Sequence, residues 1–509
     1  MSKRGCDKLH CRERSDKAPG EKMQLSKSKY VKGLQCHKAL WLQKNNPELR
    51  AATDEQTESI FQTGDSVGKV AKGLFPEGEE VVFNPSDFSG MIEQTKGLIA
   101  SGTKVIYEAT FSAKGIFAMA DFLVKNGDSW DIYEVKSSTK VKEYHLDDAS
   151  IQWYALCDTL RLNRAYIVHI NNTYVREGEL DIEALFTKID ITDRVQERQF
   201  SIESNLRQMQ EMLAKDMPDI DIGAHCVNPH VCDFHGHCWK HIPTPSVFNL
   251  YRMAGAKKFE LYYKGMMHYH DIPNEMRLSV TQALQIATSQ TKEPHIDKPI
   301  ITAFLETISY PINFFDFESF QNAIPRFEGQ RAYEQMPFQY SLHILHKDGK
   351  MEHKEFLGDE NSDPREALIK QMLEDITPTG SIVAYNQGFE KNVIKDLALF
   401  NPHFAEVLLA LNERFVDLIV PFRTRGYYHP DFNGSFSLKS VLPAMFPDDV
   451  ELDYKGLEIK NGSMAMDTFA NLHLLKDKSQ REKIREDLLA YCKLDTLAMV
   501  RIFQKLQTF

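Results

Sequence analysis

The segment Ile312–Phe320, INFFDFESF, is a mostly apolar run that contains two acids. Such a run predicts a strand embedded in a hydrophobic sheet. Because residues i and i+2 of a strand point to the same face, we expect Asp316 and Glu318 to project together. Two adjacent carboxylates repel each other unless a cation lies between them, and Mg²⁺ and Mn²⁺ prefer such oxygen ligands. The alternative is an acidic pair on an edge strand that faces water.

Two later segments add residues of the same kind. SIVAYNQGFEKNVI, residues 381–394, predicts a short strand, a turn and then a helix that begins near Glu390. DLLAYCKLDTLAMV, residues 487–500, has helical apolar spacing, which places Tyr491 and Asp495 four apart on one helix face. The C-terminal half therefore offers four acids and one phenol as candidate catalytic or metal-binding residues: Asp316, Glu318, Glu390, Asp495 and Tyr491.

These residues resemble the motifs of the DEDD exonucleases of the RNase H-like superfamily, in the subclass whose third motif is Tyr-x-x-x-Asp. The resemblance covers roughly residues 308–509 and implies a 3′–5′ exonuclease domain. It also implies that the four acids hold two Mg²⁺ or Mn²⁺ ions and that Tyr491 helps to position the attacking water. The chain departs from the family pattern at Glu390, where the family carries Asp.

A second acidic constellation is predicted in the N-terminal half. Two strand-like runs flank Asn126-Gly127-Asp128, which is a hairpin signal. With Gly127-Asp128 as the loop, Asp121 lies directly opposite Glu134; with Asn126-Gly127 as the loop, Asp121 is diagonal to Glu134 on the same face. Lys136 shares that face, and Glu108 on the preceding predicted strand is expected to join it. Such a set suits metal-assisted hydrolysis, and the alternative is a surface ladder of ion pairs.

The hairpin and the helix predicted after it resemble the RecB-like branch of the PD-(D/E)XK nucleases. Asp121, Glu134 and Lys136 match the core motif of that family, with Asp121 and Glu134 as the implied metal ligands. The family continues with a Gln-x-x-x-Tyr helix; Gln152 is present here, but position 156 is Leu and the tyrosine is at 154.

Four cysteines form the third feature. Cys226, Cys232 and Cys238 are spaced C-x5-C-x5-C, which indicates metal ligands in an intracellular chain. Cys36, inside a helix predicted over residues 25–45, is the candidate fourth ligand or else a small buried hydrophobe. This layout resembles the iron–sulfur RecB-like nucleases of the AddB and CRISPR-associated types, which implies a [4Fe–4S] cluster. Zn²⁺ is the competing metal, although its sites favour shorter spacings.

Composition and charge set the broader limits. The 509 residues are too many for one core and predict two or three domains. The two resemblances imply an α/β fold class. We expect a lead-in over 1–22, a PD-(D/E)XK domain over 23–243, a helical linker over 244–307 and an RNase H-like domain over 308–509. No apolar run is long enough for a membrane span, the start lacks a secretory signal, and eight cysteines favour a reducing cytoplasm. The net charge is −11, yet residues 1–50 carry 13 Lys and Arg against 5 Asp and Glu, so a DNA or RNA substrate is compatible.

Several features stay open at this level. The linker is expected either to grip a nucleic-acid backbone or to act as a plain spacer. Asp417 is either a further acid near the site or a capping residue, and a group of aromatics either stacks bases or belongs to the core: Tyr427, Tyr428, Phe432 and Phe436. The sequence therefore predicts a nuclease with two sites, and the alternative is a non-catalytic nucleic-acid-binding or redox-sensing protein.

Overall fold

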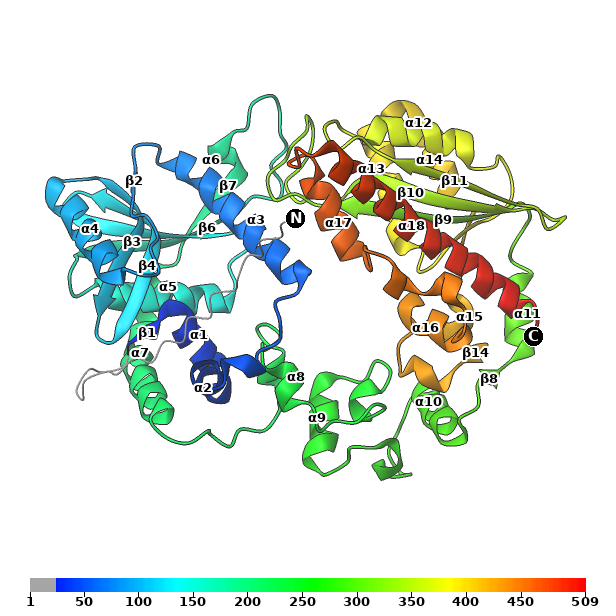
Figure 1. Ribbon diagram of the computed structural model, residues 1–509, viewed down its shortest axis with the longest axis horizontal. Coiled ribbons are helices and arrows are strands. Elements are labelled where there is room, and N and C mark those ends of the chain that lie inside the picture. Colours follow the sequence, from blue (N-terminus) through cyan, green and yellow to red (C-terminus); the bar gives the residue numbers. More distant parts are fainter. Residues whose placement is uncertain (1–23) are drawn as a thin grey trace, which may run out of the picture.

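The computed structural model describes residues 24–509, so the predicted lead-in over residues 1–22 lies outside the described residues. Two sheets, each covered by helices, form two domains that are bridged by a mostly helical segment (Figure 1). The predicted α/β class is thereby confirmed. No helix within residues 24–509 is both long enough and apolar enough to cross a membrane.

The N-terminal sheet has the strand order β2-β3-β4-β5-β6-β7, and β1 pairs with one end of β4. The β4–β5 hairpin pairs Asn126 with Ser129 and Phe122 with Tyr133, so the loop is Gly127-Asp128. Gly127 has a φ of +58°, a conformation that glycine adopts without strain. The strands are β1 (Leu25–Ser26), β2 (Glu79–Glu80), β3 (Val105–Ala113), β4 (Ile116–Asn126), β5 (Ser129–Lys136), β6 (Leu162–Ile170) and β7 (Phe186–Asp190).

Helices cover both faces of this sheet. Apolar residues of α1, α5 and α7, such as Tyr30, Ile151 and Leu206, form one core with the sheet. Val67 and Ala71 of α3 belong to a second core with Phe122. The helices are α1 (Lys27–Gln35), α2 (His37–Asn45), α3 (Glu55–Ala71), α4 (Phe88–Ser101), α5 (Glu143–Leu156), α6 (Ile182–Leu185), α7 (Thr192–Leu213) and α8 (His235–Cys238).

The prediction of a single helix over residues 25–45 is wrong, because this region contains two helices. The chain forms two helices, and Cys36 lies at the break between them with an extended backbone, φ −162° and ψ 120°. No glycine or proline causes the break, which is why apolar spacing does not reveal it. The extended conformation places Cys36 beside the other three predicted cysteines in a small cavity.

The C-terminal sheet has the order β11-β10-β9-β12-β13, with β9, β12 and β13 parallel and β10 and β11 antiparallel to their neighbours. β9 is its middle strand and is covered on both faces. Phe314 packs into the core that includes α18, whereas Phe315 and Phe317 pack into the opposite core with α12 and α13. The strands are β9 (Ile312–Phe320), β10 (Met336–Leu345), β11 (Met351–Leu357), β12 (Ile382–Ala384) and β13 (Phe415–Asp417).

The long helix α18 crosses one face of this sheet (Figure 1). Asp477 caps its N-terminus by accepting a hydrogen bond from the backbone N–H of Gln480. The helices of this domain are α12 (Arg365–Asp375), α13 (Gly388–Phe400), α14 (Ala405–Asn412), α15 (Val420–Arg423), α16 (Leu438–Met445), α17 (Gly462–Leu472) and α18 (Lys478–Leu506).

The connecting segment, which lies between α8 and β9, runs along one side of the molecule and docks on the C-terminal domain (Figure 1). Its strand β8 (His295–Ile296) pairs with β14 (Tyr427–Tyr428). Ile301 and Phe304 belong to the same apolar core as α18. Its helices are α9 (Gly255–Tyr263), α10 (Val280–Thr291) and α11 (Lys298–Leu305).

The loop after β9 also packs against the N-terminal domain. The Tyr333 hydroxyl donates a hydrogen bond to the carbonyl of Ser137, the residue after β5. Arg176 donates to the carbonyls of Pro325 and Arg326 on the same loop. The two domains therefore contact each other directly as well as through the connecting segment.

Candidate active site

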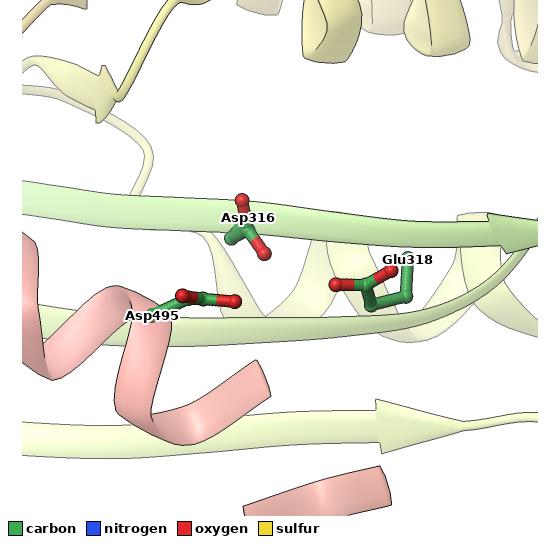
Figure 2. A group of neighbouring side chains, drawn as sticks. All are labelled: Asp316, Glu318 and Asp495. Carbon is green, nitrogen blue, oxygen red and sulfur yellow. The ribbon is translucent and has the colours of Figure 1, made fainter. Parts of the chain in front are cut away.

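Three acids converge between β9 and α18. Asp316 and Glu318 point from β9 toward Asp495 on α18 (Figure 2), and one carboxylate oxygen of each lies within 4.8 Å of the others. The alternation along β9 produces this arrangement, since both acids share the face of Phe314. Glu318 and Asp495 are buried and Asp316 is partly buried, so the edge-strand alternative does not describe these acids.

Burial and mutual repulsion shift the proton equilibria of these acids. Burial and the nearby Asp495 and Glu318 carboxylates raise the pKa of Asp316 well above its usual value. Burial, with Asp495 and Glu390, does the same to the pKa of Glu318. Burial raises the pKa of Asp495 to about 6, against the effect of hydrogen bonds from two tyrosines. The site therefore disfavours negative charge unless a cation balances it.

Glu390 lies beside the trio without belonging to it. It occupies the first turn of α13, is 3% exposed, and its Oε2 atom has no hydrogen-bond partner among the described residues. Burial raises its pKa to about 8. Its charge acts on both Asp316 and Glu318, so it lies close to them, yet it is not within the 4.8 Å group.

Asp417 serves the backbone. Its Oδ1 atom accepts hydrogen bonds from the N–H groups of Asn386, at 2.8 Å, and Ile419, at 3.1 Å. The residues that cap α13 and α15 are Gln387 and Ile419, so Asp417 is not a helix cap. It is an acid near the site, close enough to raise the pKa of Glu390. Asn386 has a φ of +68°, and its side chain accepts a hydrogen bond from Arg423 at 3.2 Å.

Two phenols support Asp495. Tyr491 lies one turn earlier on α18, as predicted, and its hydroxyl bonds the Asp495 carboxylate. Tyr454 donates a second hydrogen bond to Asp495 Oδ1, which the sequence did not reveal because its segment carries no motif. Burial raises the pKa of both phenols, so each stays protonated and acts as a donor. Cys492 is fully buried beside Asp316.

A cavity of about 560 Å³ opens over the trio and Tyr491. Its size is that of a small-molecule or cofactor pocket. Three cations lie around it, namely Arg252 of the connecting segment, Arg423 of α15 and Lys439 of α16. Lys439 is near enough to act on the charges of Glu318 and Asp495. The cavity thus combines acids at its base with cations at its rim.

The aromatic residues divide between core and cavity. Tyr427, Tyr428 and Phe432 are buried in the core with α18. Phe436 is also buried but lines the cavity, together with two tyrosines that the sequence did not single out, Tyr251 and Tyr385. Their contribution is visible only after folding, because they come from three separate segments.

The structure also brings together the N-terminal set. Glu134 is 1% exposed and lies at its centre, where it accepts hydrogen bonds from Lys136 at 2.6 Å and Gln152 at 2.5 Å. The Asp121 carboxylate accepts a hydrogen bond from the backbone of Val135 at 2.7 Å. Burial and the nearby Glu134 charge raise the pKa of Glu108, which has a φ of +54°. The set is therefore a buried network and not a surface ladder.

Two members of this network were missed by the sequence reasoning. Lys27, at the start of α1, forms an ion pair with Glu134 at 3.0 Å, and Asp148 of α5 accepts from Lys136 at 2.5 Å. Asp148 lies one helical turn before Gln152, so its spacing was a usable signal. Lys27 had none, since it reaches the site only because β1 pairs with β4.

The charges of this network are balanced by the two lysines. Burial opposes ionisation of Glu134, but Lys136 and Lys27 hold its pKa well below the usual range. Burial and the Glu134 charge raise the pKa of Asp121 to about 8. Among residues 24–509, the 4.8 Å arrangement of acids is found at the Asp316 trio and not in this set.

The four predicted cysteine ligands line one small cavity between α2 and the Cys226–Cys238 segment. All are free thiols, and burial raises the pKa of Cys232 to about 11. No three of these sulfurs, all within the described residues, lie within 4.8 Å of one another. A tetrahedral Zn²⁺ site with bonds of about 2.3 Å requires sulfurs about 3.8 Å apart. The thiols are therefore gathered but spaced more widely than around a single zinc ion.

Parts of the chain are similar to other proteins. Residues 313–437 match the family model described as a domain of unknown function, DUF2779. This region includes Asp316, Glu318 and Glu390 and ends before Tyr491 and Asp495. The chain is 28% identical over 212 residues to the uncharacterized protein UU173 of Ureaplasma parvum serovar 3, a match that covers 37% of this chain and 30% of that protein.

A second relative gives a similar picture. The uncharacterized protein MG366 homolog of Mycoplasma pneumoniae is 26% identical over 209 residues, covering 37% of this chain and 31% of that protein. The chain thus matches less than a third of the length of either relative. A solved structure titled "Crystal structure of SSO0001" shares 15% identity with a TM-score of 0.20, covering 39% of this chain and 81% of its own, and supports no conclusion on the fold. Of these comparisons, the family model is the one that includes three of the candidate acids within its matched residues, 313–437.

Proposed function

We propose that the protein is a metal-dependent nuclease that hydrolyses phosphodiester bonds of DNA or RNA at the Asp316–Glu318–Asp495 site. The observation that carries this proposal is the convergence of three acids from β9 and α18 within 4.8 Å, beneath a cavity with cations at its rim. Phosphate is attracted to the cations, and the acids need a positive partner to ionise. A bound substrate and bound divalent cations satisfy both requirements together.

The donor set fits divalent cations such as Mg²⁺ or Mn²⁺. All three acids are oxygen donors with raised pKa values, and the Glu390 Oε2 atom beside them lacks a partner among residues 24–509. Cations bound there would neutralise charge on the phosphate and lower the pKa of a bound water. Tyr454 and Tyr491 hold the Asp495 carboxylate in a fixed orientation through their hydroxyls. Tyr491 is also placed at the cavity surface, where it would orient the attacking water.

The direct test is incubation of the purified protein with end-labelled DNA and RNA strands in Mg²⁺, Mn²⁺ or EDTA. Products that shorten from one end in the presence of metal, and none in EDTA, support a DEDD-type exonuclease. Binding without cleavage under every condition supports the alternative, a non-catalytic nucleic-acid-binding or redox-sensing protein.

A second hydrolytic site of the PD-(D/E)XK type is proposed in the N-terminal domain. The observation that favours it is the direct contact of buried Glu134 with buried Gln152 and with the partly buried Lys136. Lys136 would act on negative charge that develops on a phosphate. Lys27 pairs with the same carboxylate, so it must move aside or share Glu134 when a cation binds.

The four cysteines are proposed to hold a [4Fe–4S] cluster in a reducing cytoplasm. Free thiols suit either metal site, and the separation of the sulfurs, wider than a single Zn²⁺ requires, supports a cluster over zinc. Ligand cysteines bind as thiolates, and burial raises the pKa of Cys36, Cys232 and Cys238, so binding would release protons.

A further inference from the structure

The connecting segment contributes a built surface to the C-terminal cavity. Tyr251 and Arg252 both line it, although they lie some sixty residues before β9 and outside the region matched by the family model. The Tyr251 ring packs against Phe436 with ring centroids 4.9 Å apart. The Arg252 guanidinium lies over the Tyr251 ring, 5.4 Å from its centroid.

Buried glutamines fix this pair in place. Gln285 of α10 accepts a hydrogen bond from the Tyr251 N–H at 3.0 Å, and Gln282 donates one to the Tyr251 carbonyl at 2.8 Å. Both glutamines are at least nine-tenths buried. Buried polar side chains need hydrogen-bond partners, and these two glutamines find theirs in the Tyr251 backbone. The N–H and the carbonyl of Tyr251 are therefore both held in place.

A close backbone approach fixes the segment from the other side. Gly434 has a φ of +77°, and a Cβ atom there would lie 1.9 Å from the carbonyl oxygen of Asn249. Gln285 also donates to that carbonyl, at 2.9 Å. The segment before Arg252 therefore contacts the loop before Phe436 without room for a side chain between them.

Arg252 itself is strained and has no acidic partner. Its φ is +49°, a region that costs a residue with a Cβ about 1 kcal/mol or more. Among the described residues its guanidinium makes no hydrogen bond or ion pair, although three carboxylates line the same cavity. Strained, exposed and unpaired cations held by buried supports are typical of binding sites.

We propose that Tyr251 and Arg252 form a substrate-binding subsite, in which Arg252 binds a backbone phosphate of a nucleic-acid strand and Tyr251, whose ring packs against the buried Phe436, stacks on a base. This inference rests on the proposed nuclease function and extends it, because it makes the connecting segment part of the C-terminal active site. Arg423 of α15 and Lys439 of α16, both in the C-terminal domain, are the other two cations at the rim of the cavity. Arg252 is a positioning residue: it orients the strand and leaves the chemistry to the acids.

The test measures binding of short fluorescent DNA and RNA oligonucleotides to the full-length protein in EDTA, at several salt concentrations. Arg252→Ala should weaken binding about tenfold and lower the slope of log Kd against log salt by about 0.7, the value for one lost phosphate contact on a single strand. Arg252→Lys keeps the charge and should keep the slope. Tyr251→Ala should weaken binding by about fivefold or more without changing the slope.

The matched control is Arg277→Ala, an exposed arginine of the same segment that does not line the cavity. It should leave affinity and slope unchanged. In Mg²⁺, Arg252→Ala should raise KM while kcat stays near the wild-type value.

The outcomes separate the two proposals. Cleavage by the wild type together with an unchanged affinity and slope in Arg252→Ala would overturn the subsite and leave the nuclease intact. Loss of affinity and slope in Arg252→Ala, without metal-dependent cleavage by any form, would support the subsite and reject the nuclease. An equal effect of Arg277→Ala would show general attraction to positive charge and overturn the subsite.

Discussion

Replacing Asp316 by Asn is expected to stabilise the metal-free protein while disabling its C-terminal site. The carboxylates of Asp316, Glu318 and Asp495 have oxygens within 4.8 Å of one another, and two full charges at that distance repel by about 3.5 kcal/mol at an effective dielectric constant of about 20. Protonation at the raised pKa values avoids part of this repulsion. The free energy of unfolding should therefore rise by about 1–3 kcal/mol near pH 8.

Thermal melting in EDTA at pH 8 measures this gain. In a domain of this size about 1 kcal/mol moves Tm by about 2–4 °C, so Asp316→Asn should melt about 2–12 °C above the wild type. In Mg²⁺ the difference in Tm between Asp316→Asn and the wild type should shrink or change sign. An ion that binds the folded state raises Tm, and the variant has lost one ligand for that ion. Asp348→Asn, in the exposed turn between β10 and β11, is the matched control and should follow the wild type in both buffers.

Two results would refute this reasoning. The first is an Asp316→Asn protein that melts below the wild type in EDTA, which would show that the carboxylate stabilises the fold. The second is a Mg²⁺-induced rise in Tm that is as large in Asp316→Asn as in the wild type, which would place the ion elsewhere.

Four further predictions follow from the geometry. Tyr491→Phe should slow single-turnover cleavage less than Asp316→Asn does, because it removes an orienting hydroxyl and no ligand charge; equal loss would contradict this role. With the C-terminal site disabled, Lys136→Ala should abolish residual cleavage but keep nucleic-acid binding, whereas a lower Tm alone would make the network structural. Protein purified without oxygen should be brown with four irons, and Cys36→Ser should bleach it while Cys157→Ser should not; one zinc and no iron would replace the cluster. In EDTA, Tm of the wild type relative to Tm of Glu390→Gln should fall from pH 5 to pH 8. The pKa of Glu390 is about 8 in the folded state and near 4.5 in the unfolded state, so its protonated form contributes stability at low pH, and that stability is lost as pH rises through 8. A difference in Tm that does not change with pH would contradict the raised pKa.

Local periodicity was sufficient for the elements that carry the acids. The alternation in β9 predicted that Asp316 and Glu318 share a face, and the spacing in α18 predicted that Tyr491 and Asp495 share another. Turn chemistry predicted the hairpin but left two loops open, and the strand pairing of the structure selects Gly127-Asp128. These features depend on residues that are close together in the sequence, so they can be predicted from the sequence alone.

The residues that were missed depend on contacts between distant segments. Lys27 reaches Glu134 through the β1–β4 pairing, and Tyr454 reaches Asp495 from a short 3₁₀ turn. Arg252 reaches the cavity because two glutamines and a glycine position its segment. The break at Cys36 also depends on distant segments. Local propensity favours a continuous helix there, but the extended backbone at Cys36 brings its thiol beside the other three cysteines.

The connecting segment illustrates why domain boundaries are harder to predict than strands. Its polar and proline-containing sequence was compatible with a spacer, yet Ile301 and Phe304 enter the C-terminal core and Tyr251 lines the cavity. Burial of a few apolar side chains decides its role, and their partners are more than a hundred residues away in α18.

The most direct test of the central claim is cleavage of one end-labelled strand by matched variants of the full-length protein in Mg²⁺. All carry Lys136→Ala, so that cleavage reports on the C-terminal site alone. The account predicts cleavage by this parent and by Asp348→Asn, and a loss of at least about a hundredfold in Asp316→Asn and in Asp495→Asn, with thermal melting showing that both are folded. Full activity in the Asp316→Asn and Asp495→Asn proteins would contradict the assignment of these acids to a catalytic metal site.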